Sequence, residues 1–508
     1  MTRVPPTMFP ARRWMSWPYS SVSVRDRKMP TGSRGRFAMT SRMTAQDASF
    51  YYLETSNTPM HIGSLAILEP PEGGLDYENV VRLVEKRLPE VTRYRQKVRE
   101  VAFGMARPVW VDDRDFDITY HVRRSALPRP GSDEQLFDLI ARLISRPLDR
   151  TRPLWEMYLV EGLADGRAAL FTKSHSSLVD GESSLEIGQV LFDRAPEPRE
   201  VPEELWMPEQ EPSDTALLVG AFASLVARPG EGVTAVRTAL GDLASTVAET
   251  IDVVGRLART AAQSAPESPL NASISRSRRF TVVQSDLVPY RKIHARYGCT
   301  INDVVLAVIA GALRYWLLSR GEPLTEAATV RAMVPMSVYT QEPEGPVGDG
   351  DTIQVHPQGE VSSFLVDLPV GEPNAVVRLS HISHAGEAYS RQRRRIAAQT
   401  MIRLSGFAPA TMHAVGARVA SGFSQRMFNL MITNAPGPQH PLYLAGARVL
   451  AMYPVSPLLK TQALSVALTS YDGNIYYGLN ADRDAMPDVD VLASLLHESL
   501  EELLDASR

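Results

Sequence analysis

Two short apolar runs joined by a turn stand out in the first half of the chain. The first extends from Met157 to Leu163 and the second from Ala168 to Thr172, and each has the length of a β-strand. Asp165-Gly166 between them is a typical tight-turn pair. The pattern predicts a β-hairpin. His175 and Ser176 are then expected where the second strand frays into a loop, a position that often carries functional side chains.

Helical spacing of apolar residues predicts two further elements. The run from Val304 to Leu313 is uninterrupted and apolar, Thr300 can cap its start, and Asp303 stands in a capping-box position. Because a bilayer span needs about 20 such residues, this run predicts a buried helix and no transmembrane segment. The second element is one apolar stripe that predicts an amphipathic helix, formed by Leu240, Leu243, Val247, Ile251, Val254 and Leu257.

The amphipathic stripe has two interpretations. Packing against the body of the protein is favoured, because Arg256 and Arg259 on the polar face are accompanied by acidic residues such as Asp252. The alternative is an interfacial helix that rests on a membrane or a lipid droplet.

Composition divides the chain into four segments. Residues 1–42 carry nine Arg and Lys residues against one acidic residue, Asp26, and no apolar run of signal-peptide length. They are expected to form a disordered extension with Met39 or Met43 as the working start, or else a basic arm for anionic lipid head groups. Residues 43–193 are expected to form a first lobe, 194–277 a linker with amphipathic helices, and 278–508 a second lobe that begins near a strand at Phe280–Val283.

Overall composition narrows the class of protein. A chain of 508 residues with 44% hydrophobic content can bury a large core. The formal charge of −4 argues against a general nucleic-acid binder, which needs a basic surface for counterion release. Cys299 is the single cysteine, so no internal disulfide can form, in agreement with a reducing compartment.

Short blocks along the chain occur in the order found in a known family. They are Asp47-Ala48-Ser49-Phe50, Thr58 to Gly63, Pro153-Leu154-Trp155-Glu156, Phe171 to Gly181, Ile301 to Ala307, Thr433 to Pro438, Ser470 to Gly473 and Ala481 to Asp484. From about Met43 onward the chain resembles the bacterial wax ester synthase/diacylglycerol acyltransferase family. That family is part of the CoA-dependent acyltransferase superfamily, with chloramphenicol acetyltransferases and peptide-synthetase condensation domains.

The resemblance implies both a fold and a reaction. The implied fold is α/β with mixed sheets, arranged as two chloramphenicol-acetyltransferase-like lobes with a tunnel between them. The implied reaction esterifies diacylglycerol or a long-chain alcohol with acyl-CoA, to give triacylglycerol or wax ester. Acyl-CoA is then a substrate, and no cofactor is expected.

The motif His-His-x-x-x-Asp-Gly of that family falls on residues 175–181. In the family the second His is the general base, the Asp orients the loop, and the Gly permits a tight backbone. Asp180 and Gly181 match, and His175 matches the first His, but Ser176 occupies the position of the base. A serine hydroxyl has almost no basicity at neutral pH, whereas an imidazole titrates in the useful range.

Three explanations of this replacement stay open. His175 could act as the base, although strand alternation directs it away from the expected tunnel. Ser176 could bind water or be activated by a histidine from elsewhere, such as His61. Alternatively, the protein is a catalytically silent paralogue that binds acyl-CoA or neutral lipid. We predict His175, Ser176, Asp180 and Gly181 as the catalytic motif.

Candidate substrate-binding residues lie in the second lobe. Asn302 and Asp303 could border the acyl-CoA tunnel, or they could only cap the helix that starts beside them. Asn434 precedes a Pro- and Gly-rich turn and could supply an oxyanion donor, although turn formation alone explains that composition. His381 and His384 have helical spacing but no evident third ligand, so no metal site is predicted.

These observations together predict an O-acyltransferase with acyl-CoA and diacylglycerol or a long-chain alcohol as its partners, and no nucleic acid. The predicted location is the cytoplasm, and the protein could also make peripheral contact with the inner face of the membrane or with lipid droplets.

Overall fold

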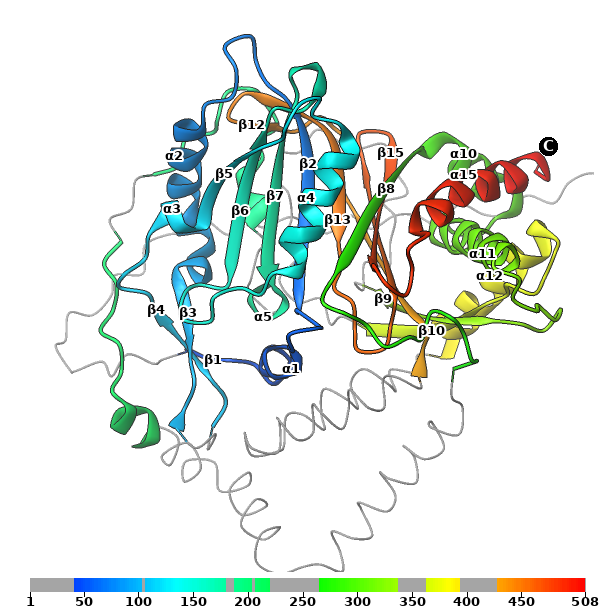
Figure 1. Ribbon diagram of the computed structural model, residues 1–508, viewed down its shortest axis with the longest axis horizontal. Helices are drawn as coiled ribbons and strands as arrows, with labels where there is room; N and C mark the ends of the chain where they lie inside the picture. The colour runs from blue at the N-terminus through cyan, green and yellow to red at the C-terminus, as the bar shows by residue number, and fades with distance from the viewer. Residues whose placement is uncertain are drawn as a thin grey trace, which may run out of the picture. The chain divides into compact units, whose positions relative to one another are not determined.

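The computed structural model describes residues 41–102, 106–179, 187–202, 206–219, 265–336, 362–392 and 427–507. In these ranges the chain forms two six-stranded sheets and one three-stranded sheet, with helices packed against them (Figure 1). Both larger sheets mix parallel and antiparallel pairs. The predicted α/β class with mixed sheets is therefore confirmed.

The first large sheet holds the predicted hairpin near its centre. Its order is β12 (Tyr443–Leu444), β13 (Ala447–Val455), β2 (His61–Glu69), β7 (Ala168–His175), β6 (Trp155–Glu161) and β5 (Val122–Ala126). β6 and β7 are antiparallel, and positive φ angles at Asp165 and Gly166 close the turn between them. The predicted hairpin is confirmed.

The second strand of that hairpin does not fray where the sequence predicts. β7 continues to its last residue, His175, and Ser176 begins the short helix α5 (Ser176–Val179). The strand continues because it has a neighbour on each side: His175 N–H donates to Leu154 O at 2.9 Å, and Ser176 N–H donates to Met60 O at 2.8 Å. Both side chains are consequently buried and do not lie on an open loop.

The second large sheet carries the long helices. Its order is β10 (Ser362–Leu368), β9 (Val330–Met336), β11 (Leu430–Pro436), β14 (Leu464–Tyr471), β15 (Asn474–Asp482) and β8 (Arg278–Asp286). The predicted strand Phe280–Val283 falls inside β8. The helices of this part are α10 (Leu287–Tyr297), α11 (Ile301–Ser319), α12 (Ala375–Gln392) and α15 (Val489–Asp505) (Figure 1).

Helix α11 confirms the predicted cap and buried core helix. The Thr300 hydroxyl accepts the N–H of Asp303, and the Asp303 carboxylate accepts the N–H of Thr300. The helix extends beyond the predicted end because Arg314 turns its guanidinium to the carbonyls of Val370 and Gly371. By length and composition α11 is the one helix in the described ranges that could cross a bilayer. However, 72% of its apolar window is buried inside the protein, as in the core helix of a globular domain.

Smaller elements complete the first part of the chain. They are β1 (Ser41–Arg42), β3 (Gln96–Arg99) and β4 (Val109–Asp112), which form the three-stranded sheet, with α1 (Ala45–Leu53), α2 (Tyr77–Arg87), η1 (Leu88–Arg95), α3 (Ile118–His121), α4 (Asp133–Ser145), η3 (Ala164–Gly166) and α6 (Ile187–Leu191). The two cores are formed by the residues of the two large sheets and their helices.

Strands β12 and β13 come from the C-terminal segment but pair within the first sheet. β13 lies antiparallel to β2, and the Tyr471 hydroxyl of the second sheet donates to Val449 O at 2.9 Å. The predicted segment boundaries stay predictions. The amphipathic stripe from Leu240 to Leu257 and residues 1–40 of the basic extension lie outside the described residues.

Candidate active site

The motif residues that the structure describes sit at the end of the central strand β7. His175 closes the strand, and Ser176 and Ser177 form the first turn of α5. The backbone at this point is held from both sides by β6 and β2, so its position is fixed by the sheet. Asp180 and Gly181 lie outside the described residues.

The hydrogen bonds of His175 determine which ring nitrogen carries the proton. Its Nδ1 accepts the backbone N–H of Ser177 at 3.0 Å, and the Ser177 hydroxyl lies 2.7 Å from the same atom. An N–H can only donate to a lone pair, so Nδ1 is unprotonated and the neutral ring carries its proton on Nε2. Burial lowers the pKa of His175 to about 3, which keeps the ring neutral at physiological pH.

Glu54, just after helix α1, lies between two histidines. Its Oε1 is 3.2 Å from Nε2 of His61, and its Oε2 is 3.8 Å from Nε2 of His175. Arg150 donates to Oε2 at 2.8 Å. Burial disfavours the carboxylate, but the two histidines and Arg150 together hold the pKa of Glu54 at about 2. Glu54 therefore stays charged.

His61 occupies the position opposite His175 on the neighbouring strand β2. The two ring centroids are 6.3 Å apart, and both side chains are 1% exposed. Burial lowers the pKa of His61, so this ring is also neutral. The His61 ring lies against the Glu54 carboxylate. Ser176 is 3% exposed, and its backbone N–H donates to Met60 O, which continues the pairing of β7 with β2.

Two imidazoles and a carboxylate are also a donor set for a transition metal. Metal binding at Nε2 of His175 would require a lone pair there, but the Ser177 N–H fixes that lone pair on Nδ1. Arg150 already binds the Glu54 carboxylate. Within the described ranges no group of three or more His, Cys, Asp or Glu side chains is placed to hold a metal ion.

A second buried charge cluster lies two residues earlier on β7. Lys173 Nζ donates to the carbonyls of Leu143 and Arg146 at the C-terminal end of α4, and lies 3.1 Å from Glu156. A cation at that end of a helix is favourable because the helix carbonyls point toward it. This cluster ties α4 to the sheet.

The structure brings two of the predicted substrate-binding residues together. The Asn434 amide donates to Oδ1 of Asn302 at 3.2 Å, so β11 and the first turn of α11 share a polar contact. Asp303 is buried and caps α11. In the described part of the chain no hydrogen bond joins these three residues to His175 or Ser176.

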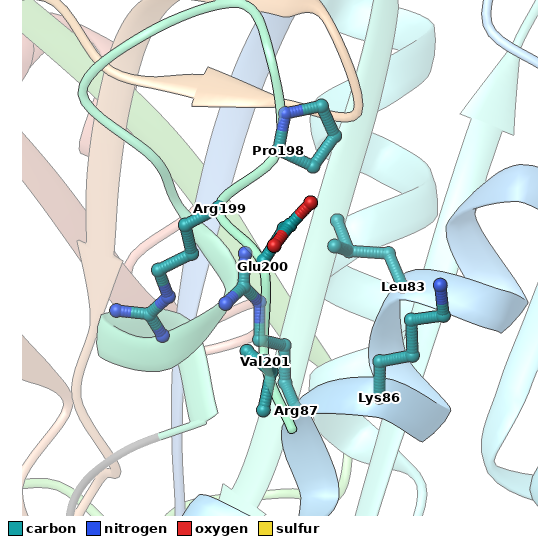
Figure 2. Close-up of a pocket in the computed structure, with 7 residues that line it drawn as sticks. All are labelled: Leu83, Lys86, Arg87, Pro198, Arg199, Glu200 and Val201. Carbon is teal, nitrogen blue, oxygen red and sulfur yellow. The ribbon is translucent and has the colours of Figure 1, made fainter. Parts of the chain in front are cut away.

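A cavity of about 320 Å³ lies beside helix α2 (Figure 2), and none of the predicted site residues is among the residues that line it. It is lined by Leu83, Lys86, Arg87, Pro198, Arg199, Glu200 and Val201. Arg87 binds both carboxylate oxygens of Asp193, and Arg199 binds Glu90, so two of its three cations are already neutralised. The tunnel implied by the resemblance stays a prediction.

Sequence reasoning found the motif but missed Glu54 and Arg150. Neither stands in one of the blocks that carry the resemblance, and an acidic residue at the end of a helix is usually solvated. The available signal was the position of Glu54 shortly before the block from Thr58 to Gly63. Only the pairing of β2 with β7 shows that this loop meets the motif.

Two family models match this chain, and together they cover most of its length. Residues 43–305 match the model of the wax ester synthase/diacylglycerol acyltransferase catalytic domain, and residues 359–504 match the WS/DGAT C-terminal domain. A probable diacylglycerol O-acyltransferase of Mycobacterium tuberculosis, tgs3, is 55% identical over 266 residues, which cover 51% of this chain and 98% of the relative. Another from the same organism, tgs1, is 32% identical over 478 residues, covering 92% and 96%.

Solved structures give the same picture. The wax ester synthase/diacylglycerol acyltransferase from Marinobacter aquaeolei VT8 has a TM-score of 0.64 at 29% identity, over 92% of this chain and 99% of that one. The first condensation domain of the calcium-dependent antibiotic synthetase has a TM-score of 0.52 at 15% identity, over 92% of this chain and 96% of that one. The second likeness concerns the fold alone.

Proposed function

The chain belongs to the wax ester synthase/diacylglycerol acyltransferase family, and we propose that its reaction is acyl transfer from acyl-CoA to the hydroxyl of diacylglycerol or a long-chain alcohol. It is an O-acyltransferase of this family's type. The observation that carries the assignment is the match to tgs1 over 92% of the chain, with the Marinobacter fold over the same share. Which acceptor it prefers is part of the proposal.

The reaction sets two requirements for the site. The alcohol oxygen forms an ester bond with the acyl carbon, the carbon–sulfur bond of the thioester breaks, and the hydroxyl proton ends on the CoA sulfur. A base must therefore accept the alcohol proton, and a donor must stabilise the oxyanion that forms on the carbonyl oxygen.

The geometry favours a positioning role for His175 over the role of base. Its Nδ1 lone pair accepts the Ser177 N–H, and its Nε2 carries the proton and faces Glu54. A pKa of about 3 also makes this imidazole a weak base at neutral pH. With Ser176 at the position of the family's base, the reaction would depend mainly on the orientation of acyl-CoA and alcohol in the site.

The serine at position 176 and the hydrogen bonds of His175 also support a second candidate function. If orientation alone is insufficient, the protein is a catalytically silent paralogue that binds acyl-CoA or neutral lipid. The replacement at Ser176 and the occupied lone pair of His175 favour this alternative specifically, because together they leave the motif without a free imidazole base.

Location is part of the proposal as well. A cytoplasmic protein with peripheral contact at the inner face of the membrane or on lipid droplets would meet an acceptor and a product that are both insoluble in water. Cell fractionation would test this: the protein should divide between the soluble fraction and the membrane or droplet fraction, and complete absence from the latter would contradict it.

The decisive assay uses purified full-length protein with labelled palmitoyl-CoA and either diacylglycerol or hexadecanol. Acyl transfer by the wild-type protein supports the proposed enzyme, and Ser176→His should then raise the rate by restoring an imidazole at the position of the base. Binding of palmitoyl-CoA without ester formation, together with activity in Ser176→His alone, would overturn it in favour of the silent paralogue.

A further inference from the structure

The loop between α1 and β2, residues 54–60, contacts both the motif and the second large sheet. It begins at Glu54, turns at Thr55–Thr58 and ends at Met60, directly before β2 starts at His61. None of the predicted site residues lies in it. Because the loop contacts the motif at its ends and the segment that leads into β8 at its middle, it can fix the position of the motif.

The ends of the loop hold the motif. Met60 O accepts the N–H of Ser176 at 2.8 Å, which extends the β2–β7 ladder to the position of the family's base. At the other end the Glu54 carboxylate lies against Nε2 of His61 and of His175. Residues 175 and 176 are thus both in contact with this loop.

The middle of the loop is held by the segment that leads into β8. The Asn57 amide donates to Ile274 O at 3.2 Å, and its Oδ1 accepts from Arg276 at 3.4 Å. Its backbone carbonyl accepts from Arg278. Arg278 is itself fixed, since its side chain is 1% exposed and lies 3.5 Å from the fully buried Asp482 of β15.

The loop is stiff enough to connect these contacts. Thr55 and Thr58 exchange backbone hydrogen bonds of 3.3 and 3.1 Å, and their hydroxyls are 2.6 Å apart. Thr58, Pro59 and Met60 are buried. A displacement of Asn57 therefore moves the carbonyl that binds Ser176, because few internal rotations remain to absorb it.

We propose that Asn57 and Glu54 are positioning residues for residues 175 and 176: Asn57 anchors the loop to the segment that enters the second sheet, and Glu54 contacts the ring of His175. As far as it concerns catalysis, the inference rests on the proposed acyl transfer. Neither residue touches the reacting atoms in this account. Asn57 acts through the Met60 carbonyl and Glu54 through the rings of His61 and His175.

A structural test that is independent of activity is hydrogen exchange of the peptide that contains Ser176 and Ser177. Asn57→Ala removes both hydrogen bonds of the Asn57 side chain to the segment that leads into β8, so exchange of this peptide should become roughly tenfold faster than in the wild-type protein. Arg276→Ala should have the same effect to a smaller degree. The matched control is Arg279→Ala on strand β8, which breaks an exposed ion pair to Asp490 of α15 and should leave the peptide unchanged.

Kinetics then test whether positioning matters for the reaction. If the proposed function holds, Asn57→Ala should lower kcat several-fold with little change in KM for palmitoyl-CoA, while Arg279→Ala should behave like the wild-type protein. Unchanged exchange at Ser176 and Ser177 in Asn57→Ala would overturn the inference whatever the activity. Faster exchange in a protein that forms no ester would instead contradict the proposed function and leave the contact established.

Discussion

The buried, neutral state of His175 makes the protein sensitive to acid in a defined pH window. In the unfolded chain the imidazole has its ordinary pKa of 6.5, whereas burial lowers the pKa in the folded protein to about 3. The unfolded state therefore binds a proton first as the pH falls. The contribution of neutral His175 to the free energy of unfolding is fully present above pH 6.5 and is progressively lost as the pH falls from 6.5 to 3.

The magnitude follows from the width of that window. One unit of pKa difference corresponds to about 1.4 kcal/mol, so the contribution of His175 falls by about 2 kcal/mol between pH 7 and pH 5. Glu54 adds little to the change in stability between pH 7 and pH 5. Its pKa is lowered from 4.5 to about 2 in the folded protein, so this carboxylate titrates mainly below pH 5.

Urea denaturation of wild-type protein and His175→Asn at pH 7 and pH 5 measures this contribution. Asparagine can still accept the Ser177 N–H but does not titrate. The wild-type free energy of unfolding should fall by about 2 kcal/mol more than that of the variant, and the other histidines cancel in the difference. Equal losses in the two proteins would refute the assignment of His175 as a buried, neutral ring.

Three further predictions concern stability. Glu54→Ala should lower the free energy of unfolding by about 1 to 3 kcal/mol, because it leaves Arg150 and two buried imidazoles without their carboxylate, and Glu54→Gln should lower it less. Urea denaturation midpoints at pH 7 measure this, and a midpoint of Glu54→Ala equal to that of the wild-type protein would contradict a role of the carboxylate. Thr300→Ala should cost about 1 kcal/mol by removing the cap of α11, and Thr300→Ser should retain most of it, as thermal melts will show. Asn302→Ala and Asn434→Ala should each cost about 1 kcal/mol, and the double variant less than their sum because they share one hydrogen bond; strict additivity would speak against that contact.

The elements that the sequence predicted correctly depend on neighbouring residues. The β6–β7 hairpin follows from two apolar runs and the turn at Asp165-Gly166, and the start of α11 follows from the exchange between Thr300 and Asp303. Both interactions join residues close in the chain, so their chemistry is visible in a short window of sequence.

The features that the sequence did not reveal depend on contacts between distant segments. The pairing of β13 with β2 joins residues nearly four hundred positions apart, about the number between Leu65 and Tyr453, and no local pattern encodes it. The extension of β7 to His175 has a similar origin, because Met60, whose carbonyl accepts the Ser176 N–H, directly precedes β2 and lies more than a hundred positions earlier in the chain. The contact of Glu54 with His175 follows from that extension.

The central claim is that His175 positions the motif and does not accept the alcohol proton. The most direct test is the rate of ester formation from saturating palmitoyl-CoA and acceptor by His175→Asn, whose side chain keeps the contact with Ser177 but has no basic nitrogen. A positioning role for His175 predicts a rate within about tenfold of wild type, whereas removal of a general base typically costs about 10² to 10⁴-fold. A loss of about a thousandfold in a variant with unchanged folding would contradict it.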